Sequence, residues 1–449
     1  MDKKYDRRSF IRRTTGSSPG DSAFMGANLS SENITKRHSD DKPVRLGFVG
    51  IGGRGAYHLN AALGIEGVEV TAICELKPER LYQAKRWVEN AGLPTPTLYD
   101  RGPEDYKRLC EHENLDAVIC CTPWEFHTPV CLAAMRNNKH AVSEVPIVVT
   151  VDEAWELVET YEKTGKWATI GLEGLGNLSV LNMIRKGMFG KIVHAEGGYV
   201  HDLRLVKFDP NEEPWRLQHS IERNGNLYPD HPMASIMPYL DINHGDRFDY
   251  LVSMSSSSVM LKNYAELNYG KDSAVANAVK NVALGDCNVT LIRTVQGKMI
   301  TLNHDTSTPH PREFSRLQGT KGVYIADQGS RRIYLEGISP KVDQWEPADK
   351  YLEENRPSII TNYNPPPRRG GGKIEGHGGG GSQTPMIWTR LIAALRENRM
   401  PDWDVYDSVT SSAISPVTEQ SVANKCRPVD FPDFTKGKWQ TSKPRLTLS

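Results

Sequence analysis

Apolar and helical stretches alternate along residues 43–172. An apolar run at 44–49 leads into a helical pattern, and a second apolar run at 68–74 ends in Glu75. The alternation continues with helical patterns at 77–90, 129–138 and 152–164, and with apolar runs at 115–121, 140–143 and 167–172. Unbroken apolar runs between helices are typical of parallel strands buried on both faces. The pattern predicts an α/β fold that begins with a doubly wound Rossmann domain over residues 43–172, with Asp152 as a helix N-cap.

Residues 173–449 follow a different pattern, in which strands outnumber helices. The segment 192–200 alternates between apolar and polar positions, as a strand with one exposed face does. Further strand patterns lie at 255–261, 276–284, 288–294, 299–304 and 322–326, and helical patterns lie at 180–186, 385–398 and 405–419. We expect a C-terminal α+β domain with a mostly antiparallel open sheet, one face covered by helices and the other free for substrate.

Two further stretches do not fit either domain. Residues 355–385 contain three consecutive prolines and two glycine runs, which favour a mobile loop. Residues 1–42 are polar and lack periodicity, as a leader or a disordered segment does. They contain the string RRSFIRR at 7–13, which resembles a twin-arginine export signal, although the apolar stretch after it is poor. Export to the periplasm and a disordered basic tail on a cytoplasmic protein are therefore both retained as interpretations.

The junction between the first two apolar runs carries a dinucleotide-binding pattern. Gly50, Gly52 and Gly55 have the spacing G-x-G-x-x-G, with a strand before them, a helix after them and an acid at the end of the next strand. Gly50 permits a tight turn, Gly52 lets the backbone approach a pyrophosphate, and Gly55 lets helix and strand pack closely. The acid, Glu75, would bond both ribose hydroxyls and repel a 2′-phosphate, so NAD is predicted over NADP. A glycine-rich connection in another doubly wound domain is the alternative.

Composition narrows the function classes. The chain of 449 residues has 55 basic and 55 acidic residues, so its formal net charge is zero and nothing indicates an electrostatic nucleic-acid binder. No apolar run reaches the length of a membrane span. Neither C-x-x-C nor H-E-x-x-H occurs, so no metal site is predicted, and the seven cysteines are interpreted as apolar core thiols.

Several strings make the chain resemble a known family. The Rossmann opening, T-P-x-x-x-H at 122–127 and E-x-P at 144–146 are similar to the glucose-fructose oxidoreductase/inositol dehydrogenase/MocA family. Most members carry E-K-P, whereas Val145 stands here, and the E-V-P variant resembles glycoside hydrolase family 109, the NAD-dependent α-N-acetylgalactosaminidases. The strings YVHDLR at 199–204, WRL at 215–217, NGNLYP at 224–229, DIN at 241–243, GDRFDYL at 245–251, DVYD at 404–407 and VDFPDF at 429–434 extend the resemblance. Members of this family often carry twin-arginine leaders, which favours the export interpretation.

The resemblance implies a set of site residues. The cofactor-binding set is Gly50, Gly52, Gly53, Arg54, Gly55, Glu75, Trp124, Glu125, Phe126, His127, Glu144, Val145 and Tyr228. The substrate-binding set is Tyr199, Arg216, Tyr228, Pro229, Asp230 and His231, and the general base is His231 or Tyr228. From the residues alone, the alternatives are a packing aromatic for Trp124, a satisfied histidine at a helix start for His127 and a surface cation for Arg216.

The family chemistry accounts for a dinucleotide site in a chain without an evident pair of acid and base carboxylates, because NAD-dependent glycosidases are an exception to the two-carboxylate scheme. The resemblance implies that NAD⁺ oxidises the sugar at C3, that a base removes the C2 proton and that the aglycone is eliminated. Water addition and reduction then give the sugar with retained configuration. Because the cofactor is unchanged overall, it is expected to stay bound. Carbohydrate is the expected partner, and a homo-oligomer is compatible with the sequence.

Some pocket positions depart from the family pattern. Gly174 and Arg312 stand where the family has an asparagine and a tyrosine, and Pro232 and Gly380 change two further pocket strings. A substrate other than N-acetylgalactosamine, or reduced activity, therefore stays open. The rival functions are a sugar oxidoreductase that releases NADH and a binding protein that retains NAD.

Overall fold

The computed structural model describes residues 42–310, 315–327, 329–364, 369 and 383–448. The predicted leader lies outside the described residues, apart from Lys42. So do the central part of the predicted loop and the positions of Arg312 and Gly380.

The first sheet is the predicted Rossmann sheet. Its strands are β1 (Val44–Val49), β2 (Val68–Cys74), β3 (Thr97–Tyr99), β4 (Ala117–Cys120), β5 (His140–Ser143) and β6 (Ala168–Thr169). Their spatial order is β3-β2-β1-β4-β5-β6, and every pair is parallel. The order reverses between β1 and β4, and doubly wound folds bind ligands outside the carboxyl ends of the strands at such a reversal.

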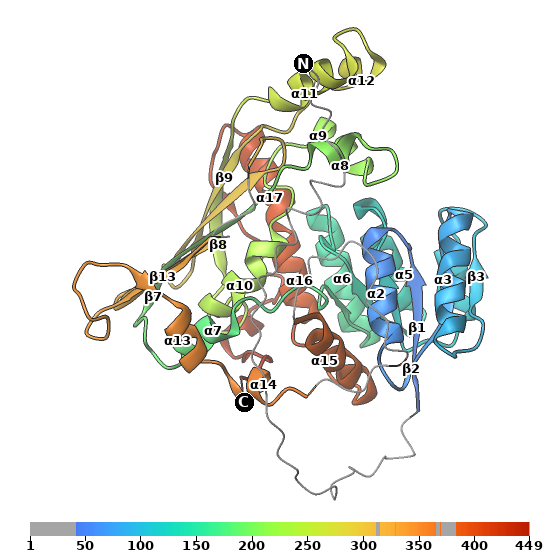
Figure 1. Cartoon of the computed structure of the whole chain (residues 1–449), viewed down its shortest axis with the longest axis horizontal. Coiled ribbons are helices and arrows are strands. Elements are labelled where there is room, and N and C mark those ends of the chain that lie inside the picture. The colour runs from blue at the N-terminus through green and yellow to red at the C-terminus, as the bar shows by residue number, and fades with distance from the viewer. Residues whose placement is uncertain (1–41, 311–314, 328, 365–368, 370–382, 449) are drawn as a thin grey trace, which may run out of the picture. The chain divides into compact units, whose positions relative to one another are not determined.

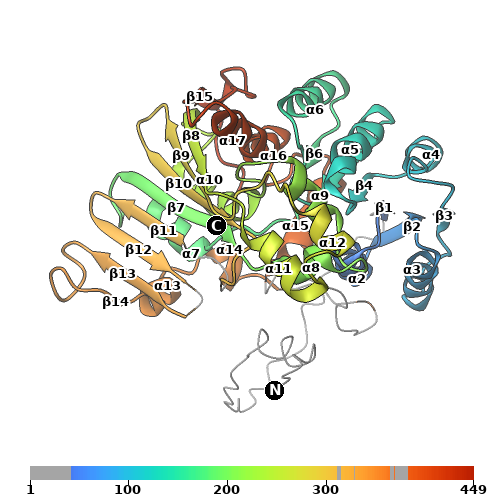
Figure 2. The same cartoon turned by 90° about the horizontal axis from the view of Figure 1, so that it is seen from above.

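Helices cover both faces of this sheet, as Figures 1 and 2 show. They are α2 (Gly53–Leu63), α3 (Pro78–Asn90), α4 (Tyr106–His112), α5 (His127–Arg136) and α6 (Val151–Thr164), with a single 3₁₀ turn, η1 (Trp124–Phe126), before α5. The predicted N-cap of α6 was wrong by two residues. Thr150 caps the helix, because its hydroxyl and the side chain of Glu153 form a reciprocal capping box, and Asp152 lies in the first turn instead.

The second sheet is open and almost entirely antiparallel, as predicted. Its strands are β7 (Ile192–Val200), β8 (Phe248–Ser255), β9 (Asn288–Thr294), β10 (Met299–Asp305), β11 (Ser315–Gly319), β12 (Gly322–Ala326), β13 (Arg331–Leu335), β14 (Glu346–Pro347) and β15 (Val429–Asp430). The order is β14-β13-β12-β11-β7-β10-β9-β8-β15, and only β7 and β10 run parallel. Both edge strands are two residues long.

Two predicted strands were wrong. The segment 255–261 contains the end of β8 and the start of a helix, and 276–284 follows the start of a second helix. Strands β11 and β13, and most of β8, were not predicted. The single helix predicted at 405–419 is divided at Ala413, where Pro416 lacks the N–H that a continuous helix would need.

The helices of this second part are α7 (Leu178–Arg185), α8 (Arg204–Phe208), α9 (Trp215–Glu222), α10 (Asp230–Leu240), α11 (Met260–Tyr269), α12 (Ala274–Ala278), α13 (Asp349–Glu354), α14 (Ser358–Thr361), α15 (Thr384–Arg396), α16 (Val405–Ser412) and α17 (Ile414–Ala423), with a 3₁₀ turn η3 (Lys438–Gln440). Helix α15 packs against α2 and β1, and α16 packs against α6, so the C-terminal part of the chain returns to the Rossmann sheet. Helices α10 and α16 lie between the two sheets in both views (Figures 1 and 2).

The open sheet has an inner face covered by helices and an outer face on which none of the described helices packs. On β7, a side chain at Gly197 would meet Pro232 and Ile236 of α10 at 3.0 and 3.4 Å, and Tyr199 points to the same side. On the outer face, Met254, Val289 and Met299 are exposed among others. The expected substrate residues thus lie on the covered face and not on the face that the sequence pattern leaves free for substrate.

Candidate functional site

The glycine turn between β1 and α2 has the shape that a pyrophosphate requires. Gly50 has φ +86°, and a Cβ at Gly55 would lie 2.0 Å from the carbonyl oxygen of Gly50. At Gly52 the space is open, since the nearest atom to a Cβ there is Nη1 of Arg80 at 3.6 Å. Gly52 caps α2 without a side-chain hydrogen bond, so the first N–H groups of this helix are available to an anion. These residues fit a dinucleotide.

Glu75 follows β2 at the same edge of the sheet and is held in place by backbone. Its Oε2 accepts a hydrogen bond from the N–H of Ile51 at 2.7 Å, and its Oε1 accepts one from the N–H of Lys77 at 2.8 Å. The carboxylate therefore ties the glycine turn to the end of the neighbouring strand. A ribose at this edge would meet a preoriented acceptor, as the motif predicts.

Arg54 extends from the first turn of α2 to the E-V-P segment. Its Nη2 and Nε donate to Oε1 of Glu144 at 2.8 and 3.0 Å, and His58 contacts the same oxygen at 2.6 Å. Burial by itself would raise the pKa of Glu144, but Arg54 and His58 outweigh it and hold this pKa well below its usual range. Val145 is buried beside it. His58 was not predicted, although it lies one helical turn after Arg54 and thus on the same face.

The four residues Trp124 to His127, which follow β4, differ in burial and in their contacts. Trp124 is buried at the pocket, while Glu125 is half-exposed and forms a 3.6 Å ion pair with His219 of α9. Phe126 is partly buried against the hydrophobic core. His127 is fully buried, and its ring nitrogens lie 2.7 Å from the carbonyl oxygen of Pro146 and 2.8 Å from that of Thr122. Both nitrogens thus lie against carbonyl oxygens, and the neutral ring donates its single N–H to one of them, which resembles the alternative interpretation of a structural histidine at a helix start.

Four rings form a continuous aromatic cluster beside the strand ends. Tyr228 stacks on Trp124 with ring centroids 5.2 Å apart, and Tyr199 meets the edge of Tyr228 at 4.7 Å. His231 stacks on Tyr199 at 5.0 Å. Burial raises the pKa of Tyr228 well above its usual range, although Arg216 opposes this. Tyr228 is therefore a hydrogen-bond donor at neutral pH and is disfavoured as the base.

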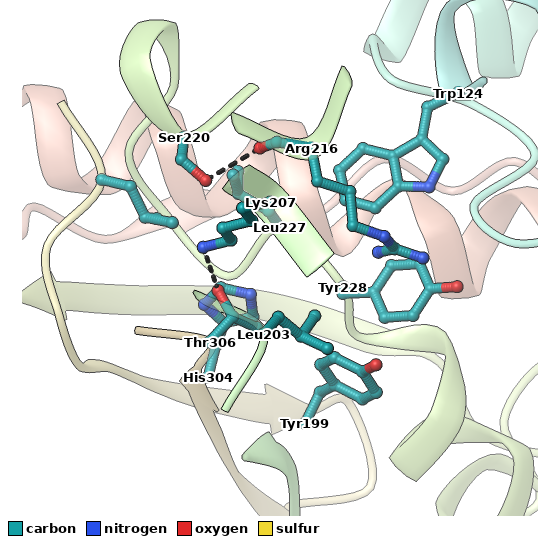
Figure 3. Close-up of a pocket in the computed structure, with 11 residues that line it drawn as sticks. Trp124, Tyr199, Leu203, Lys207, Arg216, Ser220, Leu227, Tyr228, His304 and Thr306 are labelled. Carbon is teal, nitrogen blue, oxygen red and sulfur yellow. Dashed lines mark hydrogen bonds between the residues drawn. The ribbon is translucent and has the colours of Figure 1, made fainter. Parts of the chain in front are cut away.

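Arg216 of α9 lies over this cluster and is not a surface cation. Its guanidinium carbon is 4.7 Å from the ring centre of Trp215, 5.0 Å from that of Tyr228 and 5.2 Å from that of Trp124. Glu213, one turn earlier, accepts a hydrogen bond from its Nε. Figure 3 shows the guanidinium above the hydroxyl ends of Tyr228 and Tyr199. Cation–π contacts and Glu213 therefore hold the guanidinium beside the hydroxyl groups.

A carboxylate–imidazole pair completes the site. Oε1 of Glu173, which follows β6, lies 2.7 Å from Nδ1 of His231. Burial would raise the pKa of Glu173, but His231 outweighs it and the pKa is lowered. Since Nδ1 donates to an ionised carboxylate, Nε2 is the ring nitrogen that can accept a proton. Sequence reasoning did not include Glu173 among the site residues. The available signal was an acid directly after a strand at the sheet edge that also carries Glu75 and Glu144.

The remaining expected substrate residues have structural partners. Pro229 is the N-cap residue of α10. Asp230 is fully buried, and its Oδ1 accepts hydrogen bonds from the hydroxyls of Ser411 and Ser412 at 2.7 and 2.8 Å. Ser412 Oγ in turn accepts from the N–H of Ile147 at 3.0 Å. Oδ1 of Asp230 thus ties α10 to α16.

Two of the departures from the family pattern lie in the described residues. The segment after Gly174 is held by Gln383, whose side chain accepts from the N–H of Leu175 at 3.2 Å and donates to the carbonyl of Gly176 at 2.9 Å. Pro232 packs against Gly197 of β7. Pro232 is thus next to His231 in the chain, and Gly174 follows Glu173, which contacts His231.

Comparisons with known proteins agree with this geometry. Residues 175–441 match the model of the glycosyl hydrolase 109 C-terminal domain, and residues 44–172 match that of the oxidoreductase family with an NAD-binding Rossmann fold. A glycosyl hydrolase family 109 protein of Shewanella pealeana is 38% identical over 98% of both chains. Another, of Solibacter usitatus, is 36% identical over 98% of this chain and 99% of its own.

Solved structures share the fold at low identity. A levoglucosan dehydrogenase in complex with NADH and levoglucosan has a TM-score of 0.63 and 18% identity, covering 87% of this chain and 100% of that one. An oxidoreductase domain protein from Kribbella flavida has a TM-score of 0.63 and 17% identity, with the same coverage. None of the helices in the described part of the chain combines the length and apolar character that crossing a bilayer requires. The N-terminal domain is an NAD-binding Rossmann domain, and the chain belongs to glycosyl hydrolase family 109.

Proposed function

We propose that the protein is a retaining glycosidase that uses tightly bound NAD and acts on α-N-acetylgalactosaminides or closely related sugars. Family membership supports an NAD-dependent enzyme of carbohydrates. The observation that supports the proposal is the Glu173–His231 pair, because His231 stacks on Tyr199, and Glu173 follows β6 of the sheet that also carries the dinucleotide turn.

The residues that would hold NAD are those of the glycine turn, Glu75 at the ribose, and Trp124 with Glu144 at the nicotinamide side. When bound, NAD supplies a hydride acceptor for the sugar C3 and returns the hydride at the end of the cycle. Glu144 is already paired with Arg54 and His58, so it shapes this end of the site as a fixed anion.

The protein groups bind the sugar and move the C2 proton. His231 takes this proton at Nε2, and Glu173 stabilises the imidazolium that results. Tyr228 remains protonated because it is buried, so its hydroxyl donates to the sugar. Arg216 and Tyr199 orient the ring, and the stacked rings of Trp124 and Tyr228 exclude water from the pocket wall.

A sugar oxidoreductase is the second candidate, because the similar solved structures include dehydrogenases. The buried Val145 disfavours it, since most oxidoreductase relatives carry a lysine there that assists hydride and proton transfer. Such an enzyme would release a ketone and one NADH per turnover.

Hydrolysis of nitrophenyl glycosides in D₂O without added NAD tests the proposal. We expect deuterium at C2 of the product, retained anomeric configuration and no net NADH. Cleavage without deuterium at C2 would exclude this mechanism, and stoichiometric NADH would favour the oxidoreductase. Denaturing the purified protein should release NAD(H), and failure to find it would contradict tight binding.

The variant His231→Ala isolates the base. We expect a loss of about 10²- to 10⁴-fold in turnover, the usual contribution of a general base. Its NAD content should stay at the parent level, because His231 lies on the sugar side. Parent-level turnover in His231→Ala would rule out this residue as the base.

A further inference from the structure

A small cavity lies behind the aromatic cluster, on the side of Tyr199 and Tyr228 away from their hydroxyl groups. Its volume is about 10 Å³, which is room for about one water molecule or an ion of similar size. Lys207 of α8, His304 of β10 and Thr306 line it, and Arg216 closes another part of its wall. Figure 3 shows Lys207 and Thr306 at the end of the cavity opposite the guanidinium.

The amino group of Lys207 is buried and has no carboxylate partner among the described residues. Its side chain is inaccessible, and its Nζ donates to the hydroxyls of Thr306 at 2.9 Å and Ser307 at 3.4 Å. Hydroxyl oxygens are neutral acceptors, so they do not balance the charge. Burial and Arg216 lower the pKa of Lys207 to about 7, so the amine is about half protonated at pH 7, and an anion beside it would favour the ammonium form. An isolated buried charge is costly unless an opposite charge accompanies it.

The carboxylate of Asp305, the acidic residue of β10, accepts hydrogen bonds from groups other than Lys207. Asp305 accepts hydrogen bonds from the N–H groups of Ser307 at 3.0 Å and Thr308 at 2.9 Å, and from the Thr308 hydroxyl. Its carboxylate caps this turn and attracts Lys207 only at a distance. No carboxylate is among the described residues that line the cavity, whereas two cations are.

A second polar group at the cavity lacks a partner. Nδ1 of His304 is buried and has no hydrogen-bond partner among the described residues. Burial and the charge of Lys207 lower the pKa of His304 to about 3, so the ring is neutral and offers one N–H. With its proton on Nδ1, the ring would donate to an acceptor in the cavity, and so would the third N–H of the Lys207 ammonium.

We propose that this cavity binds a small inorganic monoanion of the chloride class, held by Lys207 with His304 and Thr306. The positive lining selects an anion over a neutral water molecule, and the volume excludes carboxylates and oxyanions of larger size. The cavity shares Tyr199, Arg216 and Tyr228 with the proposed sugar site but lies on the side away from their hydroxyl groups, and an anion there goes beyond the proposed function. By joining α8 to β10, the anion would stiffen the wall behind Tyr199 and Arg216.

Thermal unfolding of the purified full chain with its NAD tests the site. Sodium chloride is compared with sodium gluconate at equal ionic strength, because gluconate is too large for the cavity. We expect chloride to raise the Tm of the parent by about 1–3 °C. The variant Lys207→Met should lose this rise. The matched control Lys139→Met, which removes another buried lysine whose Nζ donates to the carbonyl of Asn137, should keep it.

An equal chloride effect in the parent and Lys207→Met would overturn the proposal, as would no effect in the parent. If Lys207→Met does not fold, crystals of the parent grown with bromide decide the question. An anomalous bromide peak within hydrogen-bond reach of Nζ of Lys207 supports the site. Density explained by water alone at that position overturns it.

Discussion

The variant Glu173→Gln tests the central pair of the site. Glutamine keeps the size of the side chain and an oxygen that can accept from Nδ1 of His231, but it removes the negative charge. The 2.7 Å contact is partly buried, so solvent screens it only in part. A hydrogen bond to a charged group is worth about 1.5–3 kcal/mol, which corresponds to a loss of about 10- to 150-fold in kcat. The substitution should change KM little, because the lost interaction strengthens as His231 takes up the proton.

The assay is cleavage of a nitrophenyl glycoside without added NAD, with NAD content measured on the same preparation. The matched control is Glu419→Gln. Like Glu173, Glu419 has a basic partner at 2.7 Å, in this case Nε of Arg223, but it lies in α17 outside the site. Its kcat should stay within about twofold of the parent, as expected for a site that does not touch substrate. If Glu173→Gln keeps parent kcat, or both variants lose activity equally, the assignment of Glu173 as the partner of the base is wrong.

Four further variants probe the cofactor turn and the buried framework. Glu75→Ala should weaken NAD binding by about 1–3 kcal/mol and narrow the preference for NAD over NADP, measured by titration calorimetry; equal affinities in parent and variant would exclude Glu75 as the ribose acid. Gly52→Ala should leave the Tm of the NAD-free protein nearly unchanged but reduce NAD affinity. Gly55→Ala should lower the Tm, because its Cβ would meet the carbonyl of Gly50 at 2.0 Å. Equal losses of Tm in the two variants would contradict the assigned roles. Burial raises the pKa of Asp230 from 3.8 to about 6, so its contribution to stability is greatest below about pH 4 and is lost as the pH rises through 6. Asp230→Asn should therefore stabilise the fold at pH 7.5 by as much as about 3 kcal/mol and lose this advantage near pH 4, and a pH-independent difference in thermal unfolding would refute the argument.

The Rossmann domain could be predicted closely because its determinants are local. Each strand, glycine and acid of the dinucleotide-binding motif lies within a short stretch of sequence. In the second sheet, the bounds of β9 and β12 were predicted to the residue. The wrong secondary-structure predictions occur where residues far away in the sequence determine whether a segment forms a strand or a helix. Helix α11 starts where a strand was predicted, because Asp286 accepts hydrogen bonds from the N–H groups of Val259 and Met260. Helix α12 is capped by Ser273, and Ala276 on it packs in a small separate apolar cluster.

The features of the candidate site also differ in whether the sequence could predict them. The positions of Tyr199, Arg216, Tyr228 and His231 beside one another agree with the resemblance-based prediction. Glu173, the partner of His231, is 58 residues away in the chain and follows β6, whereas His231 lies in α10, so no spacing rule links the two. Likewise, the orientation of Asp230 depends on serines 181 and 182 residues later. Pairing across such distances follows from the fold and not from any local pattern.

The two-residue edge strands of the open sheet have a consequence for assembly. An exposed edge normally offers a row of free N–H and C=O groups to which a strand of another molecule can add. Here β14 consists of Glu346 and Pro347, and proline has no N–H to donate, while β15 carries the charged Asp430. Neither edge offers a template of useful length. Fibre growth by strand addition is thereby blocked at both ends of a sheet whose interior strands, such as β7 and β9, would otherwise support it.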